Sequence, residues 1–176
     1  MTQSQVPPLD EIAEFYHGYL ARVPAGDIQQ FLHDQTDRVR ATLDDIPDSF
    51  ASHRYAEGKW SIRQLVGHIS DTERVFSFRA FWFARGLEGP LPGFDQDVAV
   101  KYADDDRRDF GGLIREFTEV RASTLDLFDS LPEEAWTRGG IASDQHVTVR
   151  ALAWVIAGHV EHHLAILHER YLVRGR

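Results

Sequence analysis

Apolar residues recur along this chain with the period of an α-helix, and no long run alternates between apolar and polar positions as a β-strand would. The pattern predicts a short helix over residues 9–23 and four long amphipathic helices, over residues 27–46, 62–85, 106–131 and 148–171. Four such helices bury their apolar stripes against one another. We therefore expect an all-α four-helix bundle that forms a single domain over residues 1–176, with residues 1–8 as a frayed lead-in.

Capping residues and breakers mark the ends of these helices. Ser61, with Gln64 three residues later, has the spacing of a capping box, and Thr148 stands where the last helix needs an N-cap. Residues 86–106 are rich in glycine and proline and are too many for a plain turn between antiparallel helices. We expect this link to cross over along the bundle or to cover a site, and residues 137–147 to form a second loop.

Composition narrows the class of protein and its partners. The 176 residues include 28 acidic and 19 basic side chains, and a formal charge of −9 disfavours binding to a phosphate backbone. No apolar run is long enough to span a bilayer, and residues 1–10 lack the pattern of a secretory signal. Cysteine is absent, which excludes disulfides, thiolate metal sites and a cysteine nucleophile. We expect a cytoplasmic protein without a nucleic-acid or membrane partner. Phe78 and Phe81 lie off the inner stripe of the second long helix, and such an exposed apolar patch predicts a homodimer contact.

The nine histidines carry the clearest chemical signal, and two of them stand four residues apart on the last predicted helix. Four residues turn a helix by roughly 400° and advance it by about 6 Å, so His159 and His163 project from one face and can converge on one ion. Val160 stands where the helical zinc-protease motif has glutamate, so we do not interpret this helix as a protease site.

A third ligand must come from another helix, and His68, which borders the buried stripe of the second long helix, is the candidate. His162 lies at the edge of the stripe and is an alternative to His163, whereas His168 falls on the opposite face. The alternative without a metal is that these histidines simply pack in the core. Several buried imidazoles without a common partner would lose roughly 1–3 kcal/mol each in unmade hydrogen bonds, which a shared cation avoids.

Four motifs, occurring in order over roughly residues 27–172, resemble those of the DinB-like (YfiT-type) superfamily of metal-binding four-helix bundles. They are Tyr55-x-x-Gly58-Lys59-Trp60-Ser61-Ile62, Leu65-x-x-His68-x-x-Asp71, Pro90-Leu91-Pro92-Gly93-Phe94-Asp95 and Gly158-His159-x-x-His162-His163-Leu164. The resemblance implies that His68, His159 and His163 are the ligands of a divalent metal, typically zinc or nickel. It also implies an up-down-down-up bundle with the long crossover between the second and third long helices.

Members of the superfamily with assigned chemistry include bacillithiol-dependent S-transferases and mycothiol-dependent isomerases, and many others are described only as metal-dependent hydrolases. Three neutral imidazoles leave an ion its full charge and an open position, which suits activation of either a water or a thiol. The thiol would be a low-molecular-weight cosubstrate, since the chain has no cysteine. On the resemblance we favour thiol-dependent transfer on a small-molecule substrate, with a hydrolase or a non-catalytic metal-binding bundle as alternatives.

The pattern does not identify catalytic residues other than the candidate ligands, and two carboxylates are candidates. Asp71, one turn after His68, is placed either to orient that imidazole or to face solvent. Asp95 would reach the site if the link folds over it, and is otherwise solvated. Arg79, on the inner side of the second long helix, is expected to meet an anionic substrate, to pair with an acidic residue or to extend its charged end to solvent.

Overall fold

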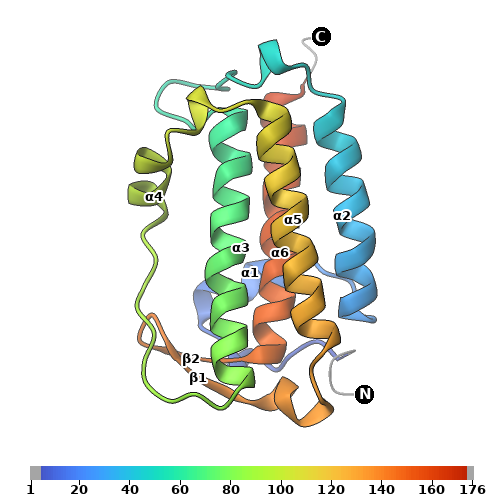
Figure 1. Cartoon of the computed structure of the whole chain (residues 1–176), viewed down its shortest axis with the longest axis vertical. Helices are drawn as coiled ribbons and strands as arrows, with labels where there is room; N and C mark the ends of the chain where they lie inside the picture. The colour runs from blue at the N-terminus through green and yellow to red at the C-terminus, as the bar shows by residue number, and fades with distance from the viewer. Residues whose placement is uncertain (1–4, 174–176) are drawn as a thin grey trace.

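The computed structural model describes residues 5–173 and has four long helices packed side by side, as the pattern predicted (Figure 1). These are α2 (Ile28–Asp44), α3 (Ile62–Ala84), α5 (Phe110–Asp129) and α6 (Val149–Ile166). Both α3 and α2 pack against α5 and α6. In Figure 1, α2 and α6 run upward while α3 and α5 run downward, so the link between α3 and α5 climbs along the side of the bundle. Within residues 5–173, no helix combines the length and the apolar character needed to cross a membrane.

The predicted capping residues are at the helix starts. Ser61 and Gln64 form the reciprocal capping box, and the Thr148 side chain accepts a hydrogen bond from the Ala151 backbone N–H at 3.1 Å. The third long helix begins at Phe110 rather than near residue 106, because residues 105–107 form a separate 3₁₀ turn. The last helix continues past Ile166 as a π-helical turn, Leu167–Tyr171.

The segment before α2 is not the helix predicted over residues 9–23. It consists of two 3₁₀ turns, Leu9–Glu11 and Glu14–Tyr16, and a single helical turn, α1 (His17–Leu20). The backbone is extended at Ile12, with φ −155° and ψ 151°, so a continuous helix is interrupted there. This break lets the segment lie across α6, against which α1 packs. Residues 1–4 of the predicted lead-in lie outside the described part of the chain.

The long link contains a helix that the sequence pattern did not predict. It is α4 (Gln96–Ala103), whose N-terminus is capped by the Asp95 carboxylate. Only Val100 of this helix is buried, so its apolar periodicity is weak. Before α4, the link is tied to the rest of the molecule by a hydrogen bond from the Leu91 N–H to the Ile141 carbonyl at 2.9 Å.

The second predicted loop is a β-hairpin. Its strands, β1 (Gly139–Ala142) and β2 (Gln145–Thr148), are antiparallel, with Ala142 opposite Gln145. Ser143 and Asp144 form the two-residue turn with φ of 53° and 61°, the left-handed values that such hairpin turns require. The loop prediction was wrong because four-residue strands and a turn without glycine carry little sequence signal.

The interior is divided by a layer of polar side chains. Along each long helix, residues of one apolar cluster give way to residues of the other, and a buried polar residue stands between them: Gln35 on α2, Glu73 on α3, Arg121 on α5 and His159 on α6. Arg121 donates to both Glu73 carboxylate oxygens at 2.7 and 2.8 Å and to Gln35 Oε1 at 3.0 Å. Gln35 in turn donates to the Ala157 carbonyl at 2.9 Å, so hydrogen bonds join all four long helices at this level.

Candidate metal centre

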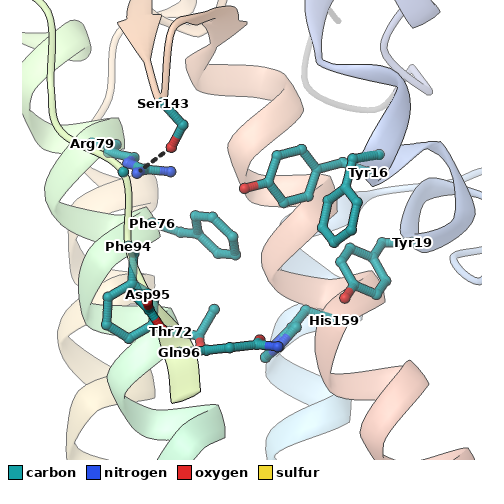
Figure 2. Close-up of a pocket in the computed structure, with 12 residues that line it drawn as sticks. Tyr16, Tyr19, Thr72, Phe76, Arg79, Phe94, Asp95, Gln96, Ser143 and His159 are labelled. Atoms are coloured by element: carbon teal, nitrogen blue, oxygen red, sulfur yellow. Dashed lines mark hydrogen bonds between the residues drawn. The ribbon is translucent and has the colours of Figure 1, made fainter. Parts of the chain in front are cut away.

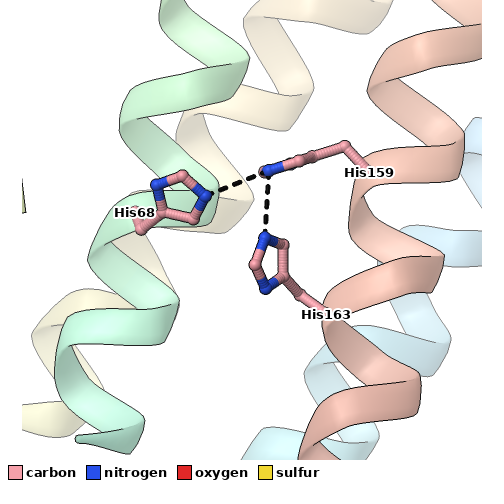
Figure 3. Close-up of side chains that lie close together, drawn as sticks. All are labelled: His68, His159 and His163. Carbon is pink, nitrogen blue, oxygen red and sulfur yellow. Dashed lines mark hydrogen bonds between the residues drawn. The ribbon is translucent and has the colours of Figure 1, made fainter. Parts of the chain in front are cut away.

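Three imidazoles meet in the polar layer (Figure 3). His159 Nε2 on α6 lies 3.0 Å from His68 Nε2 on α3 and 3.0 Å from His163 Nε2 on its own helix. The candidate ligand atoms of the three residues all lie within 4.8 Å of one another, and all three side chains are buried. The structure thus brings together the three histidines that the resemblance implies as ligands. It does not place His162 in this group, and His168 is exposed.

Local helix geometry explains why the rings converge. His159 and His163 stand one turn apart on α6, and His68 faces them from the neighbouring α3. Gly158 allows α1 to lie directly on α6, because a Cβ atom there would be 2.1 Å from the Tyr19 carbonyl oxygen. The Tyr19 ring consequently reaches the site, with its centroid 5.5 Å from that of His159.

Burial keeps the imidazoles neutral. It lowers the pKa of His68 from 6.5 to about 4, with a smaller contribution from the nearby His162. The pKa values of His159 and His163 are also well below the usual value, first through burial and then through their histidine neighbours. A neutral imidazole offers a lone pair, so at neutral pH the cluster is an uncharged set of nitrogen donors.

The donor set fits a divalent transition metal. A neutral imidazole nitrogen is either a donor or an acceptor, so His159 Nε2 cannot make good hydrogen bonds to both of its Nε2 neighbours. A cation shared by all three removes this conflict. Tetrahedral bonds of about 2.0–2.1 Å place ligand nitrogens about 3.3 Å apart, close to the 3.0 Å between the Nε2 atoms here. Three nitrogens and no carboxylate favour zinc or nickel over magnesium or calcium.

Thr72, not Asp71, contacts the far nitrogen of His68. Thr72 Oγ1 lies 3.3 Å from His68 Nδ1, which leaves Nε2 to face the other imidazoles. The Asp71 carboxylate accepts a hydrogen bond from Arg74 at 2.9 Å and is half-exposed. The sequence analysis did not single out Thr72, although it stands one helical turn after His68 and a spacing of four was the available signal.

A cavity of about 570 Å³ opens beside the cluster, and His159 lies at one end of it (Figure 2). The N-terminal segment contributes Tyr16 and Tyr19, and the link contributes Asp95 and Gln96. The link therefore does fold against the site. The Asp95 carboxylate lines the cavity while accepting hydrogen bonds from the first turn of α4, at 3.1 and 3.0 Å. The two tyrosines and Gln96 were missed, because they belong to segments without helical periodicity or at the start of a short helix.

Aromatic rings pack around the histidine cluster. The Phe76 and Tyr19 rings both pack edge-on against His159, and Trp60 lies against His68 with a centroid distance of 4.7 Å. Burial, reinforced by Tyr16, raises the pKa of Tyr19, so its hydroxyl stays protonated at neutral pH and can donate a hydrogen bond. Phe76 and Tyr19 give this end of the cavity partly apolar walls, which strengthen electrostatic interactions there.

A four-helix bundle with a buried three-histidine cluster beside a cavity defines a scaffold suited to a metal ion and a small molecule. The model of the DinB superfamily matches residues 32–167, and the chain belongs to this superfamily. The Oceanobacillus iheyensis protein OB0413, named as a candidate metal-dependent hydrolase, is 29% identical over 151 residues, covering 82% of this chain and 85% of that protein. Bacillus subtilis YfiT, named for the same candidate activity, is 22% identical over 143 residues, covering 80% of each chain.

Two solved structures have the same fold. Bacillus subtilis YfiT, described as having an unusual four-helix bundle topology, superposes with a TM-score of 0.71 at 18% identity, over 96% of this chain and 95% of that one. A mycothiol-dependent maleylpyruvate isomerase superposes with a TM-score of 0.67 at 16% identity, over 82% of this chain and 61% of the isomerase. Relatives named for metal dependence, together with the three-histidine cluster, support a divalent metal in this protein.

Proposed function

We propose that this chain is a metal-dependent enzyme that acts on a small molecule bound in the cavity beside His159. One observation carries the proposal: three buried, neutral imidazoles converge, and one of them, His159, lines a cavity of about 570 Å³, a volume typical of small-molecule sites. His68, His159 and His163 would hold the ion, which we expect to be zinc or nickel.

The ion, when bound, would supply a positive charge that favours the deprotonated form of a water or a thiol. The chain's own residues would prepare the site for this chemistry. Burial holds the imidazoles neutral, and Thr72 holds the His68 ring with Nε2 facing inward. Tyr19 covers His159 and offers a neutral hydroxyl donor, while the aromatic walls restrict water.

Of two candidate reactions, we favour transfer involving a low-molecular-weight thiol over hydrolysis. The mycothiol-dependent isomerase shares the fold, and the absence of cysteine from this chain means that a thiol would enter as a cosubstrate. Hydrolysis is the second candidate, because the sequence relatives are named as metal-dependent hydrolases. A homodimer through the exposed Phe78 and Phe81 and a cytoplasmic location are also proposals, which light scattering of the purified protein and cell fractionation will test.

Metal analysis tests the centre itself. We expect protein purified without added metal to contain close to one divalent ion per chain, and the His159→Ala and His68→Ala variants to lose it, because two imidazoles hold an ion much more weakly than three. His168→Ala is the matched control, since His168 is exposed on the same C-terminal segment, and it should keep the wild-type metal content. Retention of the ion by His159→Ala would contradict the proposed centre.

An activity screen separates the two reactions. The metal-loaded protein is offered electrophiles with and without small thiols, and activated esters without thiol, with His159→Ala measured in parallel. Turnover that requires both a thiol and His159 supports thiol transfer, and turnover of esters without thiol supports hydrolysis. A stoichiometric ion with no turnover in either arm would instead indicate a non-catalytic metal-binding bundle.

A further inference from the structure

Among the buried arginines in the described part of the chain, one has no ion pair with a carboxylate. The buried arginines of residues 5–173 are Arg63, Arg79, Arg121 and Arg150. Three of them are ion-paired with a carboxylate, namely Arg63 with Asp48, Arg121 with Glu73 and Arg150 with Glu11. Arg79, only 4% exposed, makes no ion pair with any residue from 5 to 173. A buried cation without an anionic partner is unfavourable, so its position calls for an explanation.

The contacts of Arg79 are with neutral groups. Its Nη2 donates to the Pro92 carbonyl at 2.8 Å and to Ser143 Oγ at 3.0 Å, and its Cζ lies 5.8 Å from the centroid of the Phe76 ring. These contacts hold the guanidinium between the long link and the hairpin turn. They leave its charge uncompensated, and both hydrogen bonds within residues 5–173 leave from Nη2. The N–H groups of Nε and Nη1 are therefore available to a ligand.

Arg79 lies on the wall of the cavity that ends at His159. The residues His68, Thr72, Phe76 and Arg79 follow one another on α3 at spacings of four, four and three, and so form one stripe along the helix. The stripe spans about 16 Å of helix axis from the imidazole to the guanidinium. In Figure 2, the Arg79 guanidinium stands at one end of the cavity and His159 at the other, and the Tyr16 hydroxyl points in from the opposite wall.

We propose that Arg79 binds a carboxylate of the substrate, with the substrate's apolar body on Phe76 and its reactive group next to His159. This inference rests on the proposed function in taking the cavity as the substrate site. A single arginine with neutral hydroxyl neighbours matches one negative charge, and Asp95 in the same lining disfavours a doubly charged phosphate. Arg79 is thus a specificity-determining residue that selects an organic acid over its neutral analogue.

Ligand binding to the metal-free protein tests this role without reference to activity. The probes are 3-phenylpropanoate, the neutral 3-phenylpropanamide and 2-phenylethyl phosphate, measured by titration calorimetry or ligand-observed NMR after removal of metal with a chelator. We expect the wild type to bind the carboxylate at least about tenfold more tightly than the amide, since a hydrogen bond to a charged group is worth that much. Arg79→Gln should lose this preference while its weaker binding of the amide is unchanged, and Arg79→Lys should keep part of it.

Arg85→Gln is the matched control, because it removes the same charge from an exposed position at the end of the same helix, and it should bind the carboxylate as the wild type does. Equal affinity of Arg79→Gln and wild type for the carboxylate overturns the proposal. An equal loss of acid and amide also overturns it, because Arg79 would then only shape the cavity. Tighter binding of the phosphate ester overturns the assignment of a carboxylate. The metal centre is judged separately by the metal content of His159→Ala, so either idea can fail while the other stands.

Discussion

His159 is the residue at which the polar layer, the imidazole cluster and the cavity meet. Its Nε2 faces two other imidazole nitrogens, its ring packs against Tyr19 and Phe76, and it lines the cavity. Burying three histidines is unfavourable in acid, because each would be protonated in an unfolded chain but is held neutral in the fold. The cluster therefore links the stability of the metal-free protein to pH.

The metal-free protein should lose stability as the pH falls below about 6.5. Burial lowers the pKa of His68 to about 4 and those of His159 and His163 further below their usual value, so below pH 6.5 the unfolded chain binds more protons than the folded one. As the pH falls, the free energy of unfolding therefore decreases by up to about 1.4 kcal/mol per pH unit for each histidine. Urea unfolding at pH 7.5, 6.0 and 5.0 measures this slope.

Single substitutions test whether the three buried histidines cause this pH dependence of stability. In His68→Gln, the free energy of unfolding should decrease less steeply with falling pH, because unfolding would take up roughly one proton fewer. In His168→Gln, which changes an exposed residue, it should decrease as steeply as in the wild type. Equal slopes for His68→Gln and the wild type would show that carboxylates elsewhere, rather than the buried imidazoles, govern the acid response.

The three clustered histidines could be predicted from the sequence because each lies on a long periodic helix. A spacing of four set His159 and His163 on one face, and the border of an apolar stripe placed His68. Thr72 shares that regularity with His68 but carries no chemical signal of its own. Tyr16 and Ser143 also line the cavity, but they come from a 3₁₀ turn and a hairpin turn. Only tertiary contacts bring such residues to the site, so no local pattern could show them.

At the scale of elements, α6 is the helix that joins the N-terminal segment to the bundle. It is buried along most of its length, and it contacts α1, α2 and α3. Long helices with caps could be predicted because periodicity and capping act within a few residues. The extended break at Ile12 and the single buried residue of α4 have no such signature, so the helix over residues 9–23 was wrongly predicted and α4 was missed.

The closeness of α1 to α6 depends on one glycine, and replacing it should open the site. A Cβ atom at residue 158 would stand 2.1 Å from the Tyr19 carbonyl oxygen, which is backbone and cannot rotate away. We expect Gly158→Ala to lower the free energy of unfolding by about 1–3 kcal/mol, as overpacking does. The displaced Tyr19 should also become more accessible, which fluorescence quenching can follow. Gly18→Ala is the control, because a Cβ there meets nothing within 4 Å. Equal stability of the two variants would contradict this account.

For the molecule as a whole, the site is a junction between distant parts of the chain. His68 and His159 are 91 residues apart in sequence, and the cavity also draws on the N-terminal turns, the long link and the hairpin. An ion held by His68, His159 and His163 would bridge α3 and α6 only in the folded state, because an unfolded chain does not hold these nitrogens together. Binding should therefore stabilise the entire fold rather than one loop.

Zinc should accordingly raise the melting temperature of the metal-free protein. At a free concentration of about 100 times its dissociation constant, an ion that binds only the folded state adds about 2.7 kcal/mol. For a chain of this size, that corresponds to a rise of about 5–10 °C. Magnesium at the same concentration should produce no comparable rise, because it requires oxygen ligands and the cluster offers imidazole nitrogens. His159→Ala should abolish the response to zinc and His168→Ala should retain it. An equal rise with magnesium, or an undiminished rise in His159→Ala, would mean that the stabilising ion binds elsewhere.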